Sequence, residues 1–484
     1  MRRLSPIERP AVRKMATLRS LLSASLVPIL VFTLISGCAV GPNYHRPAVP
    51  TPAAYHDLSN NQQAQAQAAS FADLPWWQVF QDPQLQELIR TALKQNYDLL
   101  IAVERINAAR DQVAITRSAL FPQVSGNGSF SGGKEGTFQT KFNFLSLTAD
   151  AAFQLDLFGR LRRATQAARA QMLATEEAQR TVTLTLVSDV ASAYFSLLQL
   201  DLELQITKDT IVTQQGSVKL TSFRLDHGVA TKLDVLQAQQ VLDTANAQLP
   251  DIERQIGQEE DAISILLGNY PGSIQRGLKL PDQPVPPSVP AGLPSSLLER
   301  RPDIREAEQL LIAANAEIGV AKAAFFPQIS LTGSGGGVFG RSSAFTSLMA
   351  SQLGIWSYGV DVSQPIFTGG ALTGNLRLAK SQQEQALLAY KEAIQHAFGD
   401  VSDALIGYQK LHEVRIQQEQ VVADLAESVR LSILRYRGGT TNYLEVLDGQ
   451  RSLFSGQLTL AQALGNEYQS LVQLYKVLGG GWQQ

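Results

Sequence analysis

The sequence predicts a mainly α-helical chain that carries membrane β-strands and is built from two tandem repeats. The first observation is an internal repeat, because residues 224–239 recur as residues 435–450 with the same spacing of Arg, Gly, Leu and Gln. The second is residues 160–226, which contain no proline and carry apolar side chains at three- and four-residue steps, as in a long helix. The third is residues 145–157, where apolar and polar residues alternate strictly, as in a strand with one apolar face.

The composition excludes several classes of protein. The chain has 484 residues, a net charge of −2 and one cysteine, and 17% of its residues are charged, against roughly 25% in ordinary soluble proteins. A near-neutral chain lacks the basic face of a nucleic-acid-binding protein, so no nucleic acid is expected as a partner. One cysteine excludes an internal disulfide and a cysteine-based zinc site, and no residue pattern indicates a cofactor, a metal site or a catalytic centre.

The N-terminus has the pattern of a secretory signal peptide over residues 1–37. Its basic residues all precede residue 20, residues 20–37 are uncharged, and small residues before Cys38 indicate a cleavage site. In this position Cys38 resembles the acylated first residue of a bacterial lipoprotein, whose acyl chains anchor the mature chain in a membrane. A retained transmembrane anchor is the alternative, and Met15 is a second candidate for the start of translation.

Each half of the chain is expected to run helix, strand, strand, helix, tip, helix. Asp82 and Pro83 have the character of an N-cap and a first-turn proline, so a helix is predicted from there to about Leu120. The strand at 145–157 is long enough to cross a membrane when tilted. The helix at 160–226 would be about 100 Å long, which exceeds any globular core, so it is expected to pack in a coiled coil.

Sharp breaks at residues 226–228 and 437–439 are interpreted as the tips of helical hairpins, where glycine supplies the positive φ that ends a helix. Between the halves, residues 271–294 hold seven of the 21 prolines and are expected to form a linker that runs over the surface. The predicted organisation after the signal peptide is a lipid-anchored arm at 38–82, repeat one at 83–270, this linker, and repeat two at 295–484.

The connections between strands are expected at residues 126–140 and 333–352, as outer surface loops. The second of these holds Gly335, Gly337 and Gly340 at the spacing of a dinucleotide-binding motif. No helix pattern follows directly, so these glycines are assigned to a surface loop instead of a nucleotide site.

The strand count indicates that several copies of the chain assemble. Two halves supply four strands, which cannot close a barrel, and open strand edges are not tolerated in lipid. The missing strands must come from other copies. Two copies would give eight strands with a filled interior, and three copies would give twelve strands with room for water.

The chain resembles the TolC family of outer-membrane efflux lipoproteins, in the branch that serves resistance–nodulation–division pumps. The resemblance covers essentially the whole mature chain and depends jointly on both tip motifs and on segments 41–47, 76–83, 156–160 and 300–304. It implies a homotrimer with a twelve-stranded β-barrel in the outer membrane and a long α-helical barrel in the periplasm. It also implies a passive exit duct for small molecules, joined through a periplasmic adaptor protein to an inner-membrane pump that supplies the energy.

The same resemblance assigns candidate gate residues near the tips. Glu445 and Asp448 match acidic positions that form rings at a closed periplasmic gate, and rings of carboxylates favour cations. Asp234 and Tyr436 match two positions of the latch, a set of polar contacts between neighbouring hairpins that holds the gate shut.

The latch arginine of some relatives is replaced in this chain by Thr441, and Arg435 or Arg437 is a candidate substitute. The positions that match adaptor-docking tips are Arg224, Gly228, Arg435, Gly439 and Thr440. Two other functions are considered: an outer-membrane duct for protein or peptide secretion, and a periplasmic coiled-coil scaffold without a pore. The membrane-length strand at 145–157 argues against the scaffold.

Overall fold

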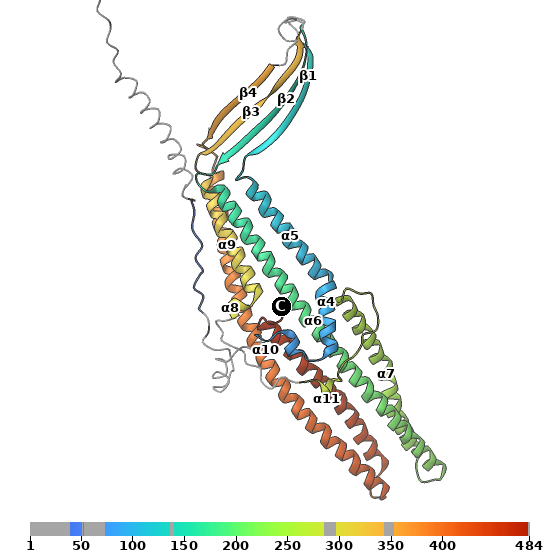
Figure 1. The fold of residues 1–484 in the computed structure, drawn as a ribbon. Helices are drawn as coiled ribbons and strands as arrows, with labels where there is room; N and C mark the ends of the chain where they lie inside the picture. Colours follow the sequence, from blue (N-terminus) through green and yellow to red (C-terminus); the bar gives the residue numbers. More distant parts are fainter. Residues whose placement is uncertain are drawn as a thin grey trace, which may run out of the picture. The chain divides into compact units, whose positions relative to one another are not determined.

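The computed structural model describes residues 39–50, 52, 73–135, 140–284, 297–342 and 353–482 (Figure 1). The predicted signal peptide and Cys38 lie outside these residues. The predicted order of helix, strand, strand, helix, tip, helix is present in both halves. The elements in chain order are α3 (Trp76–Val79), α4 (Pro83–Gln95), α5 (Tyr97–Ser118), β1 (Gln123–Glu135), β2 (Thr140–Leu155), α6 (Arg160–Asp226), α7 (Lys232–Leu266), η2 (Leu280–Asp282), α8 (Leu297–Arg300), α9 (Pro302–Ala323), β3 (Gln328–Ser342), β4 (Leu353–Ser363), α10 (Ala371–Arg437) and α11 (Tyr443–Val477).

The chain divides into two compact units. The first, which we call the strand unit, contains all four strands and comprises residues 107–173 and 309–388 together with the N-terminal segment up to Pro47. The second, the hairpin unit, comprises residues 48–106, 174–308 and 389–484 and contains the tips of both helical hairpins.

The four strands of the strand unit form one antiparallel sheet in the order β1-β2-β3-β4. Leu147 of β2 pairs with Gly128 of β1 and with Gly337 of β3, so the strand pair of one repeat lies beside that of the other. Within the described chain, β1 and β4 each have one strand neighbour, which leaves the outer edge of each open.

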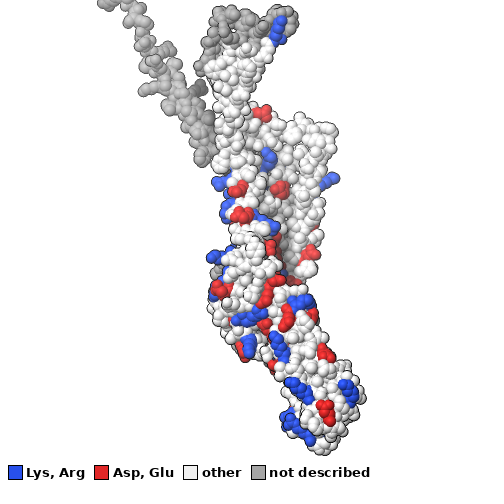
Figure 2. All heavy atoms as spheres, turned by 90° about the vertical axis from the view of Figure 1, so that its right-hand side faces the viewer, with Lys and Arg blue, Asp and Glu red and all other residues white. Residues whose placement is uncertain are grey.

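The apolar face of β2 is its more exposed face. Leu145 and Leu147 are 40% and 49% exposed, whereas Ser146 and Thr148, which alternate with them along the strand, are half-buried. A soluble sheet has the opposite arrangement, with its apolar face on the core. On the face shown in Figure 2, uncharged residues cover most of the strands, while charges of both signs are scattered over the helices. Further exposed apolar strand residues are Val124, Phe130, Leu331, Phe339, Ile355, Trp356, Tyr358, Val360 and Val362.

The assignment of outer loops at 126–140 and 333–352 is wrong for most of these residues. β1 runs to Glu135 and β3 runs to Ser342, so Gly335, Gly337 and Gly340 belong to a strand; residues 136–139 and 343–352 lie outside the described residues. Two glycines of β3, Gly336 and Gly340, permit close strand packing, whereas a Cβ at Gly335 would meet no atom within 4 Å. A Cβ at Gly336 would meet the Leu147 carbonyl oxygen well inside van der Waals contact, and one at Gly340 would meet the ring of Phe144 in the same way.

The helix predicted from Pro83 to about Leu120 is interrupted at Asn96. Asp82 caps α4 as expected, since its side chain accepts a hydrogen bond from the Gln84 amide at 2.8 Å. Asn96 then ends α4 and caps α5, because its Oδ1 accepts from the Leu99 amide at 3.0 Å. Its Nδ2 donates to the Leu266 carbonyl at 3.0 Å, a partner at the far end of α7.

The long helices confirm the periodicity argument. α6 begins at Arg160 and ends at Asp226, the bounds predicted, and α10 has the same length of 67 residues. Gly228 and Gly439 have φ of +75° and +73°, so glycine is required at each tip. One window of α6 is apolar enough to span a bilayer, but 61% of it is buried inside the protein, as in a core helix.

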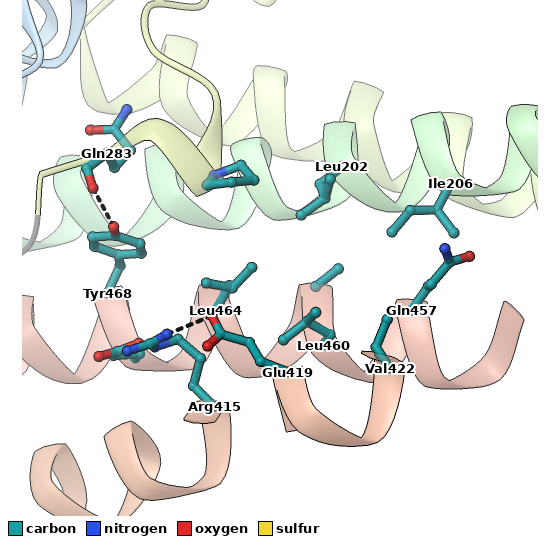
Figure 3. Close-up of a pocket in the computed structure, with 13 residues that line it drawn as sticks. Leu202, Ile206, Gln283, Arg415, Glu419, Val422, Gln457, Leu460, Leu464 and Tyr468 are labelled. Atoms are coloured by element: carbon teal, nitrogen blue, oxygen red, sulfur yellow. Dashed lines mark hydrogen bonds and ion pairs between the residues drawn. The ribbon is translucent and has the colours of Figure 1, made fainter. Parts of the chain in front are cut away.

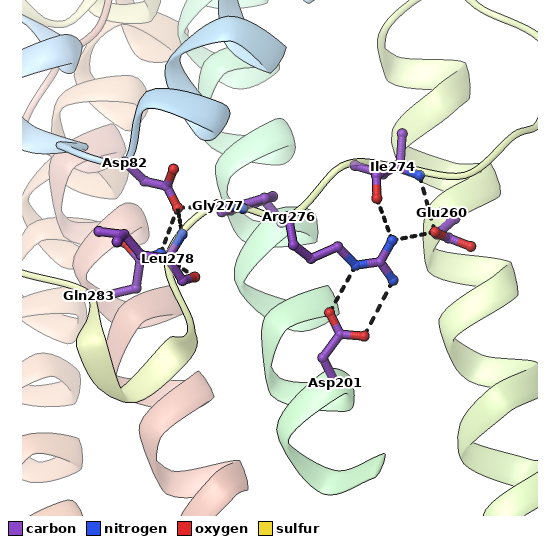
Figure 4. Close-up of polar contacts among 9 residues, drawn as sticks. Asp82, Asp201, Glu260, Ile274, Arg276, Gly277, Leu278 and Gln283 are labelled. Carbon is purple, nitrogen blue, oxygen red and sulfur yellow. Dashed lines mark hydrogen bonds and ion pairs between the residues drawn. The ribbon is translucent and has the colours of Figure 1, made fainter. Parts of the chain in front are cut away.

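Most of the linker residues that the structure describes, 271–284, are exposed, in line with the expected surface path, but a few of its side chains are buried as anchors. Leu280 is 1% exposed and Gln283 is 7% exposed. Asp82, itself 1% exposed, binds this segment: its Oδ2 accepts from the Leu278 amide at 3.0 Å and from Gln283 Nε2 at 2.7 Å (Figure 4). The Tyr194 hydroxyl donates to the same oxygen at 2.8 Å. Apart from the short η2, this segment has no regular structure, and side-chain hydrogen bonds supply partners for its backbone instead.

A second polar contact holds the linker against the helices. Arg276 donates from Nε to Asp201 Oδ2 at 2.9 Å and also pairs with Glu260 (Figure 4). The three side chains come from the linker, α6 and α7, so this ion-pair group joins three segments of the hairpin unit. Over the residues that the structure describes, the linker therefore runs along the surface and is fastened to the hairpin unit by these contacts.

Buried tyrosines make the stability of the hairpin unit sensitive to alkali. Burial raises the pKa of Tyr468 to about 12, and it also raises the pKa values of Tyr194 and Tyr475. A raised folded-state pKa stabilises the protein fully below the unfolded pKa near 10, and this stabilisation is lost as the pH rises toward the folded value. Each tyrosine then contributes a loss of about 1.4 kcal/mol per pH unit.

We therefore expect the free energy of unfolding to fall above about pH 10. The fall should be shallower in Tyr468→Phe, as measured by circular dichroism melts between pH 8 and 11.5. Tyr270→Phe is the matched control, because Tyr270 is 96% exposed and should leave the slope unchanged. Equal slopes for wild type and Tyr468→Phe would contradict the role of Tyr468.

Candidate functional site at the hairpin tips

The tip between α10 and α11 holds Glu445 in a network of its own hairpin. Asn442 caps α11, accepting from the Glu445 amide at 3.3 Å. The Glu445 carboxylate pairs with Arg435 Nη1 at 2.6 Å and accepts from the Thr441 hydroxyl. Arg435, one of the candidate substitutes for the latch arginine, is thus bound to an acidic residue of the same chain, and Thr441 supports the same carboxylate.

Asp448 lies one turn further along α11 and is exposed. Its carboxylate is 2.5 Å from Arg451 Nη2, and the two side chains are 61% and 71% exposed. Both are surrounded by solvent, so this pair contributes little to stability. The acidic side chains at this tip therefore each have an arginine partner within the chain, Glu445 through a more enclosed contact than Asp448.

The tip between α6 and α7 uses Asp234 in a capping box. Asp234 Oδ2 accepts from the Thr231 amide at 2.7 Å, and the Asp234 amide donates to the Thr231 hydroxyl at 3.2 Å. This local network does not include Tyr436, so within one described chain the two residues assigned to the latch are not brought together.

Tyr436 instead joins the two hairpins. The Arg224 guanidinium of α6 lies 4.5 Å from the centroid of the Tyr436 ring, a cation–π contact between hairpins. The Tyr436 ring lies 4.9 Å from that of Tyr443, which is buried and packs with Ala238 of α7 in one apolar cluster. Burial raises the pKa of Tyr443, so this phenol stays neutral.

The remaining tip positions are open to solvent. Gly228, Gly439 and Thr440 are exposed, and a Cβ at either glycine would meet no atom within 4 Å. The glycines are thus required by their backbone conformation and not by crowding.

Sequence reasoning missed Asn442 and Arg451. An Asn followed three residues later by Glu is an N-cap pattern, and an i,i+3 Asp–Arg pair is a helix pattern, so both signals were present.

A groove of 190 Å³ runs between α7 and α11 near the tips. Its floor is apolar, with Val241, Leu447 and Phe454, and its rim carries Gln240 and Asp448. The tips thus combine an apolar groove between two helices, acidic side chains held by local contacts, and exposed turns. No arrangement of nucleophile and base accompanies them among the residues just described.

Comparison with known proteins identifies the family. The family model described as outer membrane efflux protein matches residues 88–269 and 293–480, which is more than half of the chain. The chain belongs to the outer membrane efflux protein family. The two matched stretches correspond to the two halves of the sequence repeat, separated by the linker.

Several members of this family are similar over nearly their whole length. The chain is 38% identical to the cation efflux system protein CusC of Escherichia coli, over 95% of this chain and 99% of CusC. It is 36% identical to the toluene efflux pump outer membrane protein TtgC of Pseudomonas putida, over 96% of each chain. The crystal structure of the open state of the Neisseria gonorrhoeae MtrE outer membrane channel superposes with a TM-score of 0.82 at 31% identity, over 92% of this chain and 99% of MtrE.

These matches establish the class of function. As an outer membrane efflux protein, the chain is an outer-membrane component of an efflux system and not an enzyme. Its solved relatives are outer-membrane channels, which agrees with the mainly helical chain with membrane strands that the sequence predicts. The secretion duct considered as an alternative is not favoured, since the relatives are named for efflux.

Proposed function

We propose that three copies of this chain form a passive exit duct through the outer membrane and the periplasm. The observation that carries the proposal is the four-stranded sheet with two open edges and an outward apolar face. Lipid requires each strand edge to be paired, so β1 of one copy would pair with β4 of the next. Three copies would close twelve strands around a water-filled interior, whereas two would close eight around a filled one.

The hairpin tips would form the periplasmic gate of the duct. Glu445, Asp448, Asp234 and Tyr436 all lie at or next to the two tips, which supports this assignment. Repeated about a threefold axis, the carboxylates would surround a narrow opening and favour cations. Because Arg435 and Thr441 already hold Glu445, the closed state would draw on contacts within each hairpin as well as contacts between chains.

The same tips would receive a periplasmic adaptor protein that links the duct to an inner-membrane pump. The docking positions proposed are Arg224, Gly228, Arg435, Gly439 and Thr440. The exposed glycine turns and the apolar groove between α7 and α11 support this role, since a helical partner can enter such a groove. Substances leaving through the duct would be small molecules delivered by the pump.

We also propose that Cys38 carries the lipid that anchors the mature chain. The residues directly after it are firmly held in the strand unit, which supports an ordered start of the chain. The Val40 amide donates to the Phe158 carbonyl at 3.0 Å, and Arg163 Nη2 donates to Asn43 Oδ1 at 2.8 Å. Gly41, with φ of +109°, lies so close to Gly319 that a Cβ there would clash with the Gly319 backbone.

Planar-bilayer recording of the purified full-length protein tests the duct. The expected result is discrete ion-conducting steps that favour cations, with native mass spectrometry of the same sample giving three copies of the chain. Folded protein that never conducts would overturn the duct and favour the periplasmic scaffold. A conducting assembly of two copies would overturn the trimer alone.

A further inference from the structure

A cavity of 430 Å³ lies in the hairpin unit, back from the tips along the helices. Pockets for small organic ligands usually have volumes of about 300–1,000 Å³. Figure 3 shows Leu202 and Ile206 of α6 on one side, with Leu460 and Leu464 of α11 on the other. The full lining is Leu202, Ile206, Pro281, Gln283, Arg415, Glu419, Val422, Gln457, Leu460, Ala461, Leu464, Glu467 and Tyr468.

The polar side of the cavity is a cluster around Glu467, which is only 1% exposed. Glu467 Oε2 lies 2.5 Å from Arg415 Nε, and Glu467 Oε1 lies 2.6 Å from His412 Nδ1. Arg415 also pairs through Nη1 with Glu419 Oε1 at 2.6 Å (Figure 3). Glu467 Oε2 is buried. Its contact with Arg415 Nε is an ion pair without hydrogen-bond alignment, so Oε2 accepts no hydrogen bond from the described residues.

The charged side chains that line the cavity do not balance. Arg415 is the only cationic side chain among the described residues that line the cavity, and it faces the two carboxylates of Glu419 and Glu467. Among the side chains that line the cavity, two carboxylates therefore face one guanidinium, beside a space that leucine, isoleucine, valine, alanine and proline side chains line for the most part. Tyr468 does not compensate Glu467, because its hydroxyl donates to the Gln283 carbonyl at 2.7 Å.

We propose that this cavity binds a small organic cation with an apolar body. The apolar body would lie among Leu202, Val422 and Leu460, and the positive group would lie beside the buried Glu467 and the more exposed Glu419. The attraction would be strongest at Glu467, because burial excludes water there. A bare metal ion fits less well, because no three His, Cys, Asp or Glu side chains in the described ranges converge as ligands. An occupant would touch α6, α10 and α11 and so bind both hairpins at once.

Titration calorimetry on the purified full-length protein at about pH 8 tests this site. The probes are benzyltrimethylammonium and, as an anion of similar size, p-toluenesulfonate. Benzyltrimethylammonium should bind at least tenfold more tightly than p-toluenesulfonate. Glu467→Gln should weaken its binding at least tenfold, and Leu460→Trp, which fills the cavity but keeps both carboxylates, should abolish it.

Glu413→Gln is the matched control, since Glu413 is an α10 carboxylate that pairs with Lys410 outside the cavity and should leave binding unchanged. If Glu467→Gln fails to fold, Leu460→Trp decides the question. Equal binding of the two probes, or cation binding that survives Leu460→Trp, would overturn the proposal. The calorimetric test does not require the protein to form a pore, so failure of the cation-binding proposal can be distinguished from failure of the proposed duct.

Discussion

Replacing Asp82 with alanine is expected to lower the free energy of unfolding by about 3–5 kcal/mol. The Asp82 carboxylate accepts hydrogen bonds from Gln84, Tyr194, Leu278 and Gln283 in a buried site. Removing it leaves buried donors without an acceptor, and each orphaned donor costs about 1–3 kcal/mol. Denaturant titration in detergent, followed by tryptophan fluorescence, measures the loss.

Asp282→Ala is the matched control for Asp82→Ala. Asp282 belongs to the same linker through η2 but is exposed, so its loss should change stability by less than about 0.5 kcal/mol. Asp82→Asn should fall between the two, because the amide keeps an acceptor for the Gln84 cap and loses the charge. Equal stabilities of Asp82→Ala and Asp282→Ala would mean that the buried hydrogen bonds do not hold the linker.

Removing the acidic groups at the α10–α11 tip is expected to open the proposed duct. In planar bilayers the double variant Glu445→Ala/Asp448→Ala should conduct several-fold more than wild type and should prefer cations less. Loss of Glu445 frees Arg435 and Thr441, which weakens the tip, and loss of both carboxylates removes the negative charge from the opening. Single-channel conductance and reversal potentials measure the two effects.

The structure also predicts which of the two single variants changes the conductance more. Glu445→Ala should raise conductance more than Asp448→Ala, because Asp448 contacts Arg451 in solvent and holds nothing else in place. Glu427→Ala is the matched control. Glu427 pairs with Arg430 at i,i+3 on α10, and both side chains are more than half exposed, like those of Asp448 and Arg451. The Glu427–Arg430 pair lies away from the tip. If the wild type conducts and the double variant conducts equally, the proposed duct is retained and the proposed gate at the α10–α11 tip is refuted.

The pattern of neighbouring residues was sufficient to predict the long helix α6, the hairpin tips and β2. The bounds of α6 and both tips were predictable because a helix without proline continues until glycine supplies a positive φ, and this signal lies within a few residues. The alternation at residues 145–157 predicted β2 in the same way. The sequence by itself therefore determined the order of elements, the repeat and the class of protein.

Tertiary structure decided the features that depend on distant partners. The break at Asn96 is bound to Leu266, and the linker is bound to the buried Asp82, which lies 196 residues before Leu278. The glycine-rich stretch of β3 lies in a strand because β2 pairs with it and approaches Gly336 and Gly340 closely, although such a stretch in isolation favours a loop. The charged cluster around Glu467 likewise arises only when α10 and α11 meet. In each case the free energy comes from burying a polar or small group against a specific neighbour, and one-dimensional periodicity carries no information about that neighbour.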